Sequence, residues 1–436
     1  MEPVKVGLLG LGTVGGGTAT VLKRNAEEIA RRAGRGIVID YAANLDLSRA
    51  EELGLSGIRL TRDAMDVVND PDIQIVVELI GGYTVARDLV MQAIRNGKHV
   101  VTANKALIAM HGNELFALAQ EKGVMIAFEA AVAGGIPVIK AIREGLAANR
   151  IEWLAGIING TSNFILTEMR DKGRPFADVL AEAQALGYAE ADPTFDIEGV
   201  DAAHKLTILS SIAFGIPLQF KQTFIEGISR ITADDVSYAS ELDYNIKLLG
   251  IARRTDKGIE QRVHPTLIPK RRLIANVDGV MNAVVVKGDA VGPTLYYGAG
   301  AGAEPTASAV IADLVDVTRA LTSDPENRVP HLAFQASQLA DTAILPIEEV
   351  ETAFYLRMCA IDRPGVLADV TRIMGDRHIS IEAFIQKEPK KGENKVDIIM
   401  LTQRVREGNM NEAIAAIEAL DSICSQVTRI RVETLG

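Results

Sequence analysis

Three glycines near the start of the chain constrain its fold more than any other feature. Gly10, Gly12 and Gly15 directly follow the apolar run VKVGLL and directly precede a helical segment. In this context the first glycine allows a tight turn, the second lets a pyrophosphate approach the backbone, and the third lets helix and strand pack closely. The start of the helix offers free N–H groups to phosphates. We therefore predict a dinucleotide site at this turn rather than a turn used only for packing.

The segments that follow alternate between strands and helices up to about residue 130. Alternation of this kind predicts parallel βαβ units in a doubly wound, Rossmann-like sheet. The first domain is therefore expected over 1–130. We predict strands at 4–9, 36–43, 73–79, 98–102 and 124–128, and helices at 14–33, 61–69, 84–96 and 105–122.

The region 131–320 contains both helical segments and extended runs, which predicts an α+β domain for catalysis and dimerisation. A helix at the end of 298–310 could return to the first domain, which the sequence leaves open. The segment 321–350 is typical of a linker. In the α+β region we predict helices at 137–148, 164–172, 176–186 and 200–213, and extended runs at 151–159, 260–268 and 280–286.

The last part of the chain, 351–436, predicts a complete βαββαβ unit of the ferredoxin-like type. A polar turn, EPKKGENK at 388–395, separates its second and third strands. We expect this module to be removable without breaking the first two domains.

Composition excludes some partners. The net charge is -11 and no basic block occurs, which argues against a nucleic-acid or anionic-membrane surface. No uninterrupted apolar stretch predicts a membrane span, and the start of the chain is a poor signal peptide.

Cys359 and Cys424 are interpreted as small core residues, although the sequence leaves a disulfide between them open. We expect a cytoplasmic protein.

Two lysines lie in segments that favour chemistry. Lys105 follows Thr102 at the end of an apolar strand, which is the ligand edge of a doubly wound sheet. Lys205 lies four residues after Asp201 on an unusually apolar helix, so the two share a face and the lysine is expected to be partly buried. Burial lowers the pKa of a lysine toward a catalytic range. His204 points to another side of this helix and is interpreted as structural.

A third segment, GIINGTSNFIL, places Gly160 and Thr161 where a strand ends and a helix begins. Free N–H groups and hydroxyls there favour either a bound carboxylate or a simple helix cap. Carboxylates such as Glu190 and Asp201 would suit an ammonium group. Together these segments predict a small zwitterionic substrate beside a nicotinamide.

Several segments in the same order resemble those of homoserine dehydrogenase. They are GLGTVG, ELIGG, TANKAL, FEAAVAGGIP, GIINGTSNFIL, GYAEADPTFDIEGVDAAHKL and YGAGAGAEPTASAV, and they span residues 4 to about 320. The C-terminal unit resembles an ACT domain, whose first strand-to-helix turn matches IDRPGVL. The whole chain thus resembles the long, single-function form of this family.

The resemblance implies reversible NAD(P)H-dependent reduction of L-aspartate 4-semialdehyde to L-homoserine, the branch step toward threonine and methionine. It implies that Lys205 donates the proton to the carbonyl oxygen and that Lys105 takes part at the active site. The residues implied for the substrate are Glu190, Asp201, Asp196, Gly160 and Thr161. Those assigned to the cofactor are Gly10, Gly12, Thr13, Val14, Gly15, Thr102, Lys105 and Gly302.

The family also implies a monovalent cation, such as Na⁺, on the FEAAVAGGIP loop. Its ligands would be the Glu129 carboxylate and the carbonyls of Val132, Gly134 and Ile136, a set too poor in charge for a dedicated divalent site. The ACT-like turn at Asp362 and Gly365 would bind an amino-acid effector, L-threonine being the expected one, or the module would serve dimerisation alone.

One departure from the family concerns the cofactor. Leu45 stands where many members carry an arginine at the end of the second strand, so a 2′-phosphate would lose its usual partner. This argues against exclusive use of NADP, and the choice between NAD and NADP stays open. A homodimer or homotetramer is the default assembly.

Two rival functions are considered. One is another ACT-bearing dehydrogenase, acting on 2-hydroxy acids, but no histidine lies in the motif that such chemistry usually needs. The other is a non-catalytic sensor of nucleotide and amino acid. The intact segments around Lys105 and Lys205 argue against a sensor.

Overall fold

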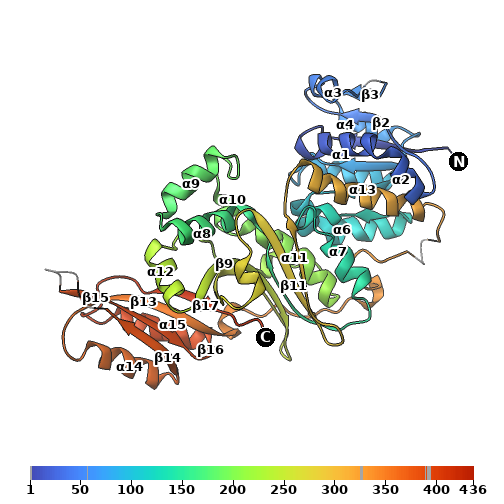
Figure 1. The fold of residues 1–436 in the computed structure, drawn as a ribbon. Coiled ribbons are helices and arrows are strands. Elements are labelled where there is room, and N and C mark those ends of the chain that lie inside the picture. Colours follow the sequence, from blue (N-terminus) through green and yellow to red (C-terminus); the bar gives the residue numbers. More distant parts are fainter. Residues whose placement is uncertain (1, 56, 325–327, 388, 390–393) are drawn as a thin grey trace. The chain divides into compact units, whose positions relative to one another are not determined.

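The computed structural model describes residues 2–55, 57–324, 328–387, 389 and 394–436. The chain forms two compact units, which we describe one at a time, and Figure 1 colours the chain along its sequence. The first unit contains Met1–Gly160, Asp201–Lys221 and Met281–Thr342, and the second contains Thr161–Val200, Gln222–Val280 and Ala343–Gly436.

The first unit contains a six-stranded parallel sheet in the order β3-β2-β1-β4-β5-β6. This is the order of dinucleotide-binding folds, so the predicted Rossmann-like sheet is confirmed. Its central strands are almost wholly buried, as expected where helices cover both faces of a parallel sheet. The strands are β1 (Val4–Leu9), β2 (Ile37–Ala43), β3 (Arg59–Thr61), β4 (Ile75–Glu78), β5 (His99–Thr102) and β6 (Ile126–Ala127).

The helices of this sheet differ from the prediction at three places, one of which is the short helix α3 (Ser48–Glu52), which was not predicted. The predicted helix 14–33 is broken at Asn25, a residue whose side chain competes with helical hydrogen bonding. The predicted helix 61–69 starts only at Ala64, because Thr61 ends β3 and Asp63 caps the helix by accepting from the Met65 N–H. The helices are α1 (Thr13–Arg24), α2 (Ala26–Ala33), α3 (Ser48–Glu52), α4 (Ala64–Asn69), α5 (Val85–Arg95) and α6 (Lys105–Lys122).

A late helix, α13 (Ala303–Ala320), packs against α1 within the same unit. A Cβ on Gly17 of α1 would lie 2.5 Å from the carbonyl oxygen of Ala303, so the glycine permits this close approach. Arg24 forms a bidentate ion pair with Glu304 at the helix start, at 2.8 Å for each contact. The helix after the second glycine run therefore does return to the dinucleotide-binding fold.

The rest of the first unit is mixed. The predicted helix 137–148 is reduced to one helical turn, α7 (Val138–Lys140), followed by a π-helical turn over Ala141–Gly145. Strands β7 (Ile151–Ile157) and β11 (Met281–Gly288) pair antiparallel, and β12 (Gly292–Ala299), which was not predicted, pairs with β11. Helix α11 (Val200–Phe214) is almost entirely buried, as its apolar sequence predicts.

The second unit contains a long antiparallel pair, β9 (Tyr244–Arg254) and β10 (Ile259–Pro269). Strand β9 was not predicted, because buried residues such as Lys247 and Asn245 interrupt its apolar pattern. The short strand β8 (Phe224–Ile225) pairs with β10. Its helices are α8 (Gly160–Lys172), α9 (Phe176–Ala185), α10 (Thr194–Ile197) and α12 (Ala233–Glu241).

The C-terminal part of this unit confirms the predicted βαββαβ module. Its sheet order is β17-β13-β15-β14, and both helices pack on one apolar face. The predicted turn 388–395 lies largely outside the described residues, as does part of the predicted linker. The elements are β13 (Glu351–Ile361), α14 (Val366–Asp376), β14 (Ile381–Gln386), β15 (Lys395–Thr402), the two-residue β16 (Val405–Arg406), α15 (Glu407–Glu418) and β17 (Thr428–Val432).

This module shares a sheet and buried ion pairs with the rest of its unit, contacts that the expectation of a removable module did not include. Strand β17 pairs in parallel with β10, aligning Arg431 with Thr266. The buried guanidinium of Arg262 on β10 donates to Glu433 Oε1 at 2.5 Å, and buried Arg431 pairs with Glu407 and, at 3.0 Å, with Glu226. Removal of the module would leave the buried Arg262 without one of its carboxylate partners, which is strongly destabilising.

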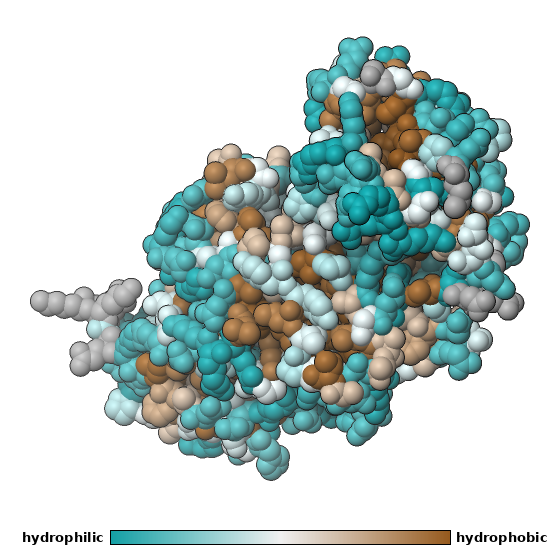
Figure 2. Space-filling view, turned by 45° about the vertical axis from the view of Figure 1, so that its right-hand side comes forward, coloured by the Kyte–Doolittle hydropathy of each residue, from teal (hydrophilic) through white to brown (hydrophobic). Residues whose placement is uncertain are grey.

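Two further expectations concern the surface. Cys359 and Cys424 are free thiols, and Cys424 is exposed rather than part of the core. No helix within the described ranges is both long and apolar enough to traverse a membrane. Figure 2 shows hydrophilic side chains over most of the visible face, with hydrophobic ones in scattered patches.

Candidate active site

The opening glycine turn has the geometry that its sequence predicts. Gly10 has φ +94°, and a Cβ there would lie 2.9 Å from the carbonyl oxygen of Leu79. A Cβ on Gly15 would overlap the carbonyl oxygen of Gly10, whereas one on Gly12 would meet no atom within 4 Å. The turn thus has tight packing at two glycines and open space at the third, and α1 begins directly after it at Thr13. These residues fit a dinucleotide pyrophosphate.

The loop after β2 lies next to this turn. The side-chain oxygen of Asn44 accepts from the Leu11 N–H at 2.9 Å, which ties the two loops together. Leu45 is 84% exposed, and its carbonyl accepts a long contact of 3.4 Å from Nε of Arg62. The sequence analysis did not identify Asn44 or Arg62, because neither lies in a recognised motif.

Thr102 is buried at the end of β5 and connects two loops. Its hydroxyl donates to Oε2 of the buried Glu78 at 2.7 Å and accepts from the Asn104 N–H. Glu78 Oε1 also accepts from the N–H groups of Ile80 and Gly81. The loops after β4 and β5 are therefore fixed to each other. Glu78 was missed as an individual residue, although it opens the quoted ELIGG segment.

The two predicted lysines meet at one carboxylate. Lys205 Nζ lies 2.7 Å from Oδ2 of Asp201, and Lys105 Nζ lies 3.1 Å from Oδ1 of the same residue. Lys205 also donates to the Ile158 carbonyl at 2.7 Å, and the Asn159 amide donates to Asp201 at 2.9 Å. Burial alone would raise the pKa of Asp201, but the two ammonium groups hold that pKa well below its usual range.

This cluster is suited to proton transfer beside a developing negative charge. Two ammonium groups share one carboxylate, so the cluster carries a net positive charge when both lysines are protonated. Lys105 begins α6 directly after β5, at the sheet edge where the glycine turn also lies. The predicted partial burial of Lys205 is confirmed.

His204 is structural, as predicted. Its ring is buried and packs on Phe220 with ring centroids 4.3 Å apart. Burial lowers the pKa of His204 to about 4, so it is neutral near pH 7.

The predicted substrate residues on α8 belong mainly to the second unit. The Thr161 hydroxyl donates to the Tyr188 carbonyl at 2.5 Å, and the Ser162 hydroxyl donates to the Asp196 carbonyl at 3.0 Å. The first bond fixes the loop that carries the exposed Glu190 to the first turn of α8, and the second fixes α10 to the same turn. A helix start and an acidic loop are thereby brought together within this unit.

Glu129 on the FEAAVAGGIP loop is buried in the first unit. Its two carboxylate oxygens accept from the N–H groups of Ile139 and Lys140 at 2.9 and 2.8 Å. Burial, and then the charge of nearby Asp313, raises the pKa of Glu129 to about 7. Part of the same loop adopts left-handed backbone, with φ 47° at Gly134. An acid of this kind would gain from a bound cation, and Lys140 already lies 3.6 Å from Asp313.

The second glycine run lies against this loop. A Cβ on Gly134 would approach the carbonyl oxygen of Gly300 to 2.6 Å, and Gly302 has φ +124° at the start of α13. Close backbone approach and left-handed geometry therefore explain glycine at these positions.

The turn of the C-terminal module lines a pocket of ≈ 450 Å³. Gly365 has φ +97° and directly precedes α14, and the Asp362 N–H donates to the Asn394 carbonyl. The lining residues are Ile361, Asp362, Arg363, Pro364, Gly365, Val366, Leu367, Gln386, Val396 and Ile398.

The sheet order, the glycine turn and the lysine–carboxylate cluster define a nicotinamide-dependent dehydrogenase. Comparison with protein-family models identifies the family of dehydrogenase. The model for the NAD-binding domain of homoserine dehydrogenase matches residues 10–129, the homoserine dehydrogenase model matches 137–315, and the ACT model matches 354–421. The chain belongs to the homoserine dehydrogenase family and is an oxidoreductase of that activity.

Relatives over the full length agree with this assignment. The chain is 68% identical to the homoserine dehydrogenase of Pseudomonas aeruginosa and 57% identical to that of Neisseria gonorrhoeae, each over 100% of both chains. A solved homoserine dehydrogenase from Thiobacillus denitrificans is 71% identical, with a TM-score of 0.96 over 100% of this chain and 99% of that one. A hyperthermophilic archaeal homoserine dehydrogenase in complex with NADPH is 26% identical over 73% of this chain and 98% of that one, with a TM-score of 0.62.

Proposed function

We propose that the cluster of Lys105, Asp201 and Lys205 is the catalytic centre for reversible reduction of L-aspartate 4-semialdehyde to L-homoserine. The observation that carries this proposal is the single buried carboxylate shared by two ammonium groups. Lys205 donates a proton to the carbonyl oxygen, and Lys105 stabilises the same developing charge. Asp201 keeps both side chains oriented and protonated.

The hydride is supplied by the nicotinamide cofactor when it is bound. Cofactor residues on this proposal are Gly10, Gly12, Thr13, Val14, Gly15, Lys105 and Gly302, with Thr102 fixing the loops around the nicotinamide through Glu78. The open space at Gly12 and the start of α1 support the pyrophosphate position. Because Leu45 offers no charge and Arg62 lies beside it, we propose that both NAD and NADP are accepted.

The substrate's amino-acid end is assigned to the second unit. Glu190 takes the ammonium group, the start of α8 at Gly160 and Thr161 takes the carboxylate, and Asp196 supports the loop. The hydroxyl bonds that tie this loop to α8 support the assignment, because they hold the two charge-binding elements in one place.

A monovalent cation such as Na⁺ is proposed at Glu129, with the carbonyls of Val132, Gly134 and Ile136. Burial of an acid whose pKa is raised toward neutrality supports a cation there. One carboxylate with three backbone carbonyls carries too little charge for a dedicated divalent ion, so a monovalent ion is proposed.

Regulation and assembly form the last part of the proposal. The pocket at Asp362 and Gly365 binds L-threonine, the end product of one branch, and inhibits the enzyme. The chain works in threonine and methionine biosynthesis in the cytoplasm as a homodimer or homotetramer. We keep the division into 1–130, 131–320, 321–350 and 351–436 as its functional domains.

The test is a homoserine oxidation assay with NAD⁺ and NADP⁺, with and without L-threonine, on the full chain and on Asp362→Ala. We expect activity with both cofactors, inhibition of the parent chain by threonine, and loss of inhibition in the variant with basal activity kept. Unchanged inhibition in the variant would remove the pocket from its role. Absence of any threonine effect would leave assembly as the function of the module.

A further inference from the structure

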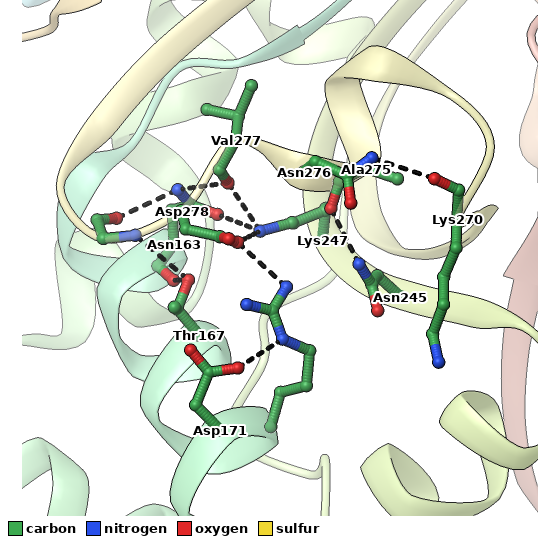
Figure 3. A network of polar contacts seen from close by, with 12 residues as sticks. Asn163, Thr167, Asp171, Asn245, Lys247, Lys270, Ala275, Asn276, Val277 and Asp278 are labelled. Carbon is green, nitrogen blue, oxygen red and sulfur yellow. Dashed lines mark hydrogen bonds and ion pairs between the residues drawn. The ribbon is translucent and has the colours of Figure 1, made fainter.

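Lys247 is a fully buried cation that the proposed reaction does not use. Its side chain is 1% exposed on β9. The ammonium donates to the carbonyl of Val277 at 2.6 Å, to Oδ1 of Asp278 at 3.0 Å and to Oδ1 of Asn163 at 3.1 Å. Figure 3 shows Lys247 pointing into this group of oxygens. A lysine buried to this degree loses its hydration, so its position must be set by these acceptors.

The contact with Asn163 carries the effect of Lys247 to α8. With its oxygen held by Lys247, the Asn163 amide directs its N–H groups to the carbonyls of Val277 and Gly279 at 3.0 and 2.9 Å. Thr167, one turn further along α8, accepts from the Gly279 N–H at 3.2 Å. The Asn163 amide thus joins the N-terminal part of α8 to the loop 277–279, while Thr167 and Arg170 join the loop to later turns of the same helix (Figure 3).

The first turn of α8 holds two loops at once. Asn163 faces Lys247 and the 277–279 loop, while Thr161 holds the loop that carries Glu190 and Ser162 holds α10. The loop that carries Glu190 and the 277–279 loop are therefore both held at the N-terminal part of α8. Any change in the position of this turn moves both loops together.

We propose that Lys247 is a positioning residue for the amino-acid end of the substrate. It fixes the first turn of α8 through Asn163, and so sets the spacing between the carboxylate site at Thr161 and the ammonium site at Glu190. This inference rests on the proposed substrate site and concerns homoserine and the semialdehyde, not the nicotinamide.

The same contacts make the positioning pH-dependent. A neutral amine has two N–H groups and a lone pair, so it cannot donate to all three oxygens. Burial lowers the pKa of Lys247 to about 8. The negative charge of Asp278 opposes this lowering, and that of Asp171 opposes it weakly. The positive charge of Arg170 lowers the pKa further. Among these neighbours Asp278 is itself paired with Arg170 at 2.9 Å. Loss of the proton above about pH 8 should loosen the turn of α8 and weaken homoserine binding.

The test compares Lys247→Met with Lys270→Met. Lys270 is a half-buried lysine of the same unit that donates to Ser240, and Figure 3 shows its side chain directed away from the network. We expect Lys247→Met to raise the KM for homoserine about tenfold or more, with the KM for the cofactor and the extent of folding by circular dichroism little changed. Lys270→Met should leave both constants near the parent values.

Two further measurements keep the outcomes distinct. In the parent enzyme the KM for homoserine should rise above about pH 8 while that for the cofactor stays level, a result that does not depend on a folded variant. Thr161→Val tests the substrate site itself. If Thr161→Val leaves the homoserine KM unchanged, the proposed site is wrong. If it raises that KM but Lys247→Met and high pH do not, the site stands and the role of Lys247 is overturned.

Discussion

The ammonium of Lys205 lies 2.7 Å from the carboxylate of Asp201, one helical turn away on the buried helix α11. Lys105 reaches the other oxygen of that carboxylate from the start of α6. The pair on α11 has sequence spacing of four and would form on any exposed helix. Burial and the second lysine distinguish this pair from an ordinary exposed one, because they leave an excess of positive charge that would suit the alkoxide of the proposed reaction.

Asp201→Asn should impair catalysis by leaving two ammonium groups without their shared carboxylate. Mutual repulsion then lowers the pKa of one lysine, so the acid form needed for semialdehyde reduction is lost at a lower pH. We expect turnover to fall by about two orders of magnitude or more, and the alkaline limb of its pH profile to move toward lower pH. A pH profile unchanged in shape would contradict this account of the cluster.

Gly12→Ala and Gly15→Ala should separate cofactor binding from folding. A Cβ on Gly12 would meet no other protein atom, so Gly12→Ala should have the same thermal unfolding midpoint as the parent chain. It should nevertheless bind nicotinamide dinucleotide at least about tenfold more weakly. The Gly15 Cβ would overlap the Gly10 carbonyl, so this variant should lose thermal stability itself. Thermal unfolding and fluorescence titration with NADH measure the two effects, and equal behaviour of the variants would refute the assignment.

The buried acids near the proposed cation site should make stability depend on pH and on sodium. The pKa of Glu129 is raised from 4.5 to about 7 and that of Asp313 from 3.8 to about 6, chiefly by burial. An acid whose pKa is raised on folding contributes stability that is present at low pH and lost as pH rises through the folded value.

The parent chain should therefore lose Tm relative to Glu129→Gln as pH rises from about 5 to about 8 in choline chloride. Sodium chloride at the same ionic strength should reduce this loss, because Na⁺ stabilises the ionised acid. A Tm difference between the two proteins that does not change with pH would show that Glu129 is not the group responsible. Equal curves in both salts would argue against the cation.

Glu433→Ala tests the attachment of the C-terminal module. The buried Arg262 and the nearby Arg253 would lose a carboxylate and keep Glu260. We expect a loss of about 3 kcal/mol in the free energy of unfolding by urea, and recovery of most of it when Arg262→Met is added. The exposed ion pair of Lys387 with Glu241 provides the control, since Lys387→Ala should cost less than about 1 kcal/mol. A similar cost at both places would contradict a structural role for the buried pair.

Local pattern was enough to predict the parallel sheet and the C-terminal module, because their strands are apolar runs bounded by clear turns. It failed at β9, where Asn245 and Lys247 break the apolar pattern although both side chains are buried. Such burial depends on partners like Asp278 that no window of sequence contains. The same reason explains why the contacts of the C-terminal module were not predicted, since the pairing of Arg262 with Glu433 joins distant parts of the chain.

The sequence names the candidate site residues one by one, and only the structure shows how some of them are arranged. Spacing alone placed Asp201 and Lys205 on one face, and the structure adds Lys105 to them. Glu78 lies inside the ELIGG segment. Its role in joining two loops is revealed only by its hydrogen bonds to Thr102 and to the turn after β4. Resemblance supplied roles for Glu190 and Thr161, and the hydroxyl bonds of α8 give a physical reason for their association.

The most direct test of the catalytic proposal is the turnover number of Lys205→Ala. It is measured at saturating homoserine and cofactor from the absorbance of the reduced nicotinamide that the reaction forms. Cofactor binding is measured on the same preparation. The account predicts that turnover falls by about two to four orders of magnitude while cofactor affinity changes little. Turnover close to that of the parent enzyme would contradict the assignment of Lys205 as the proton donor.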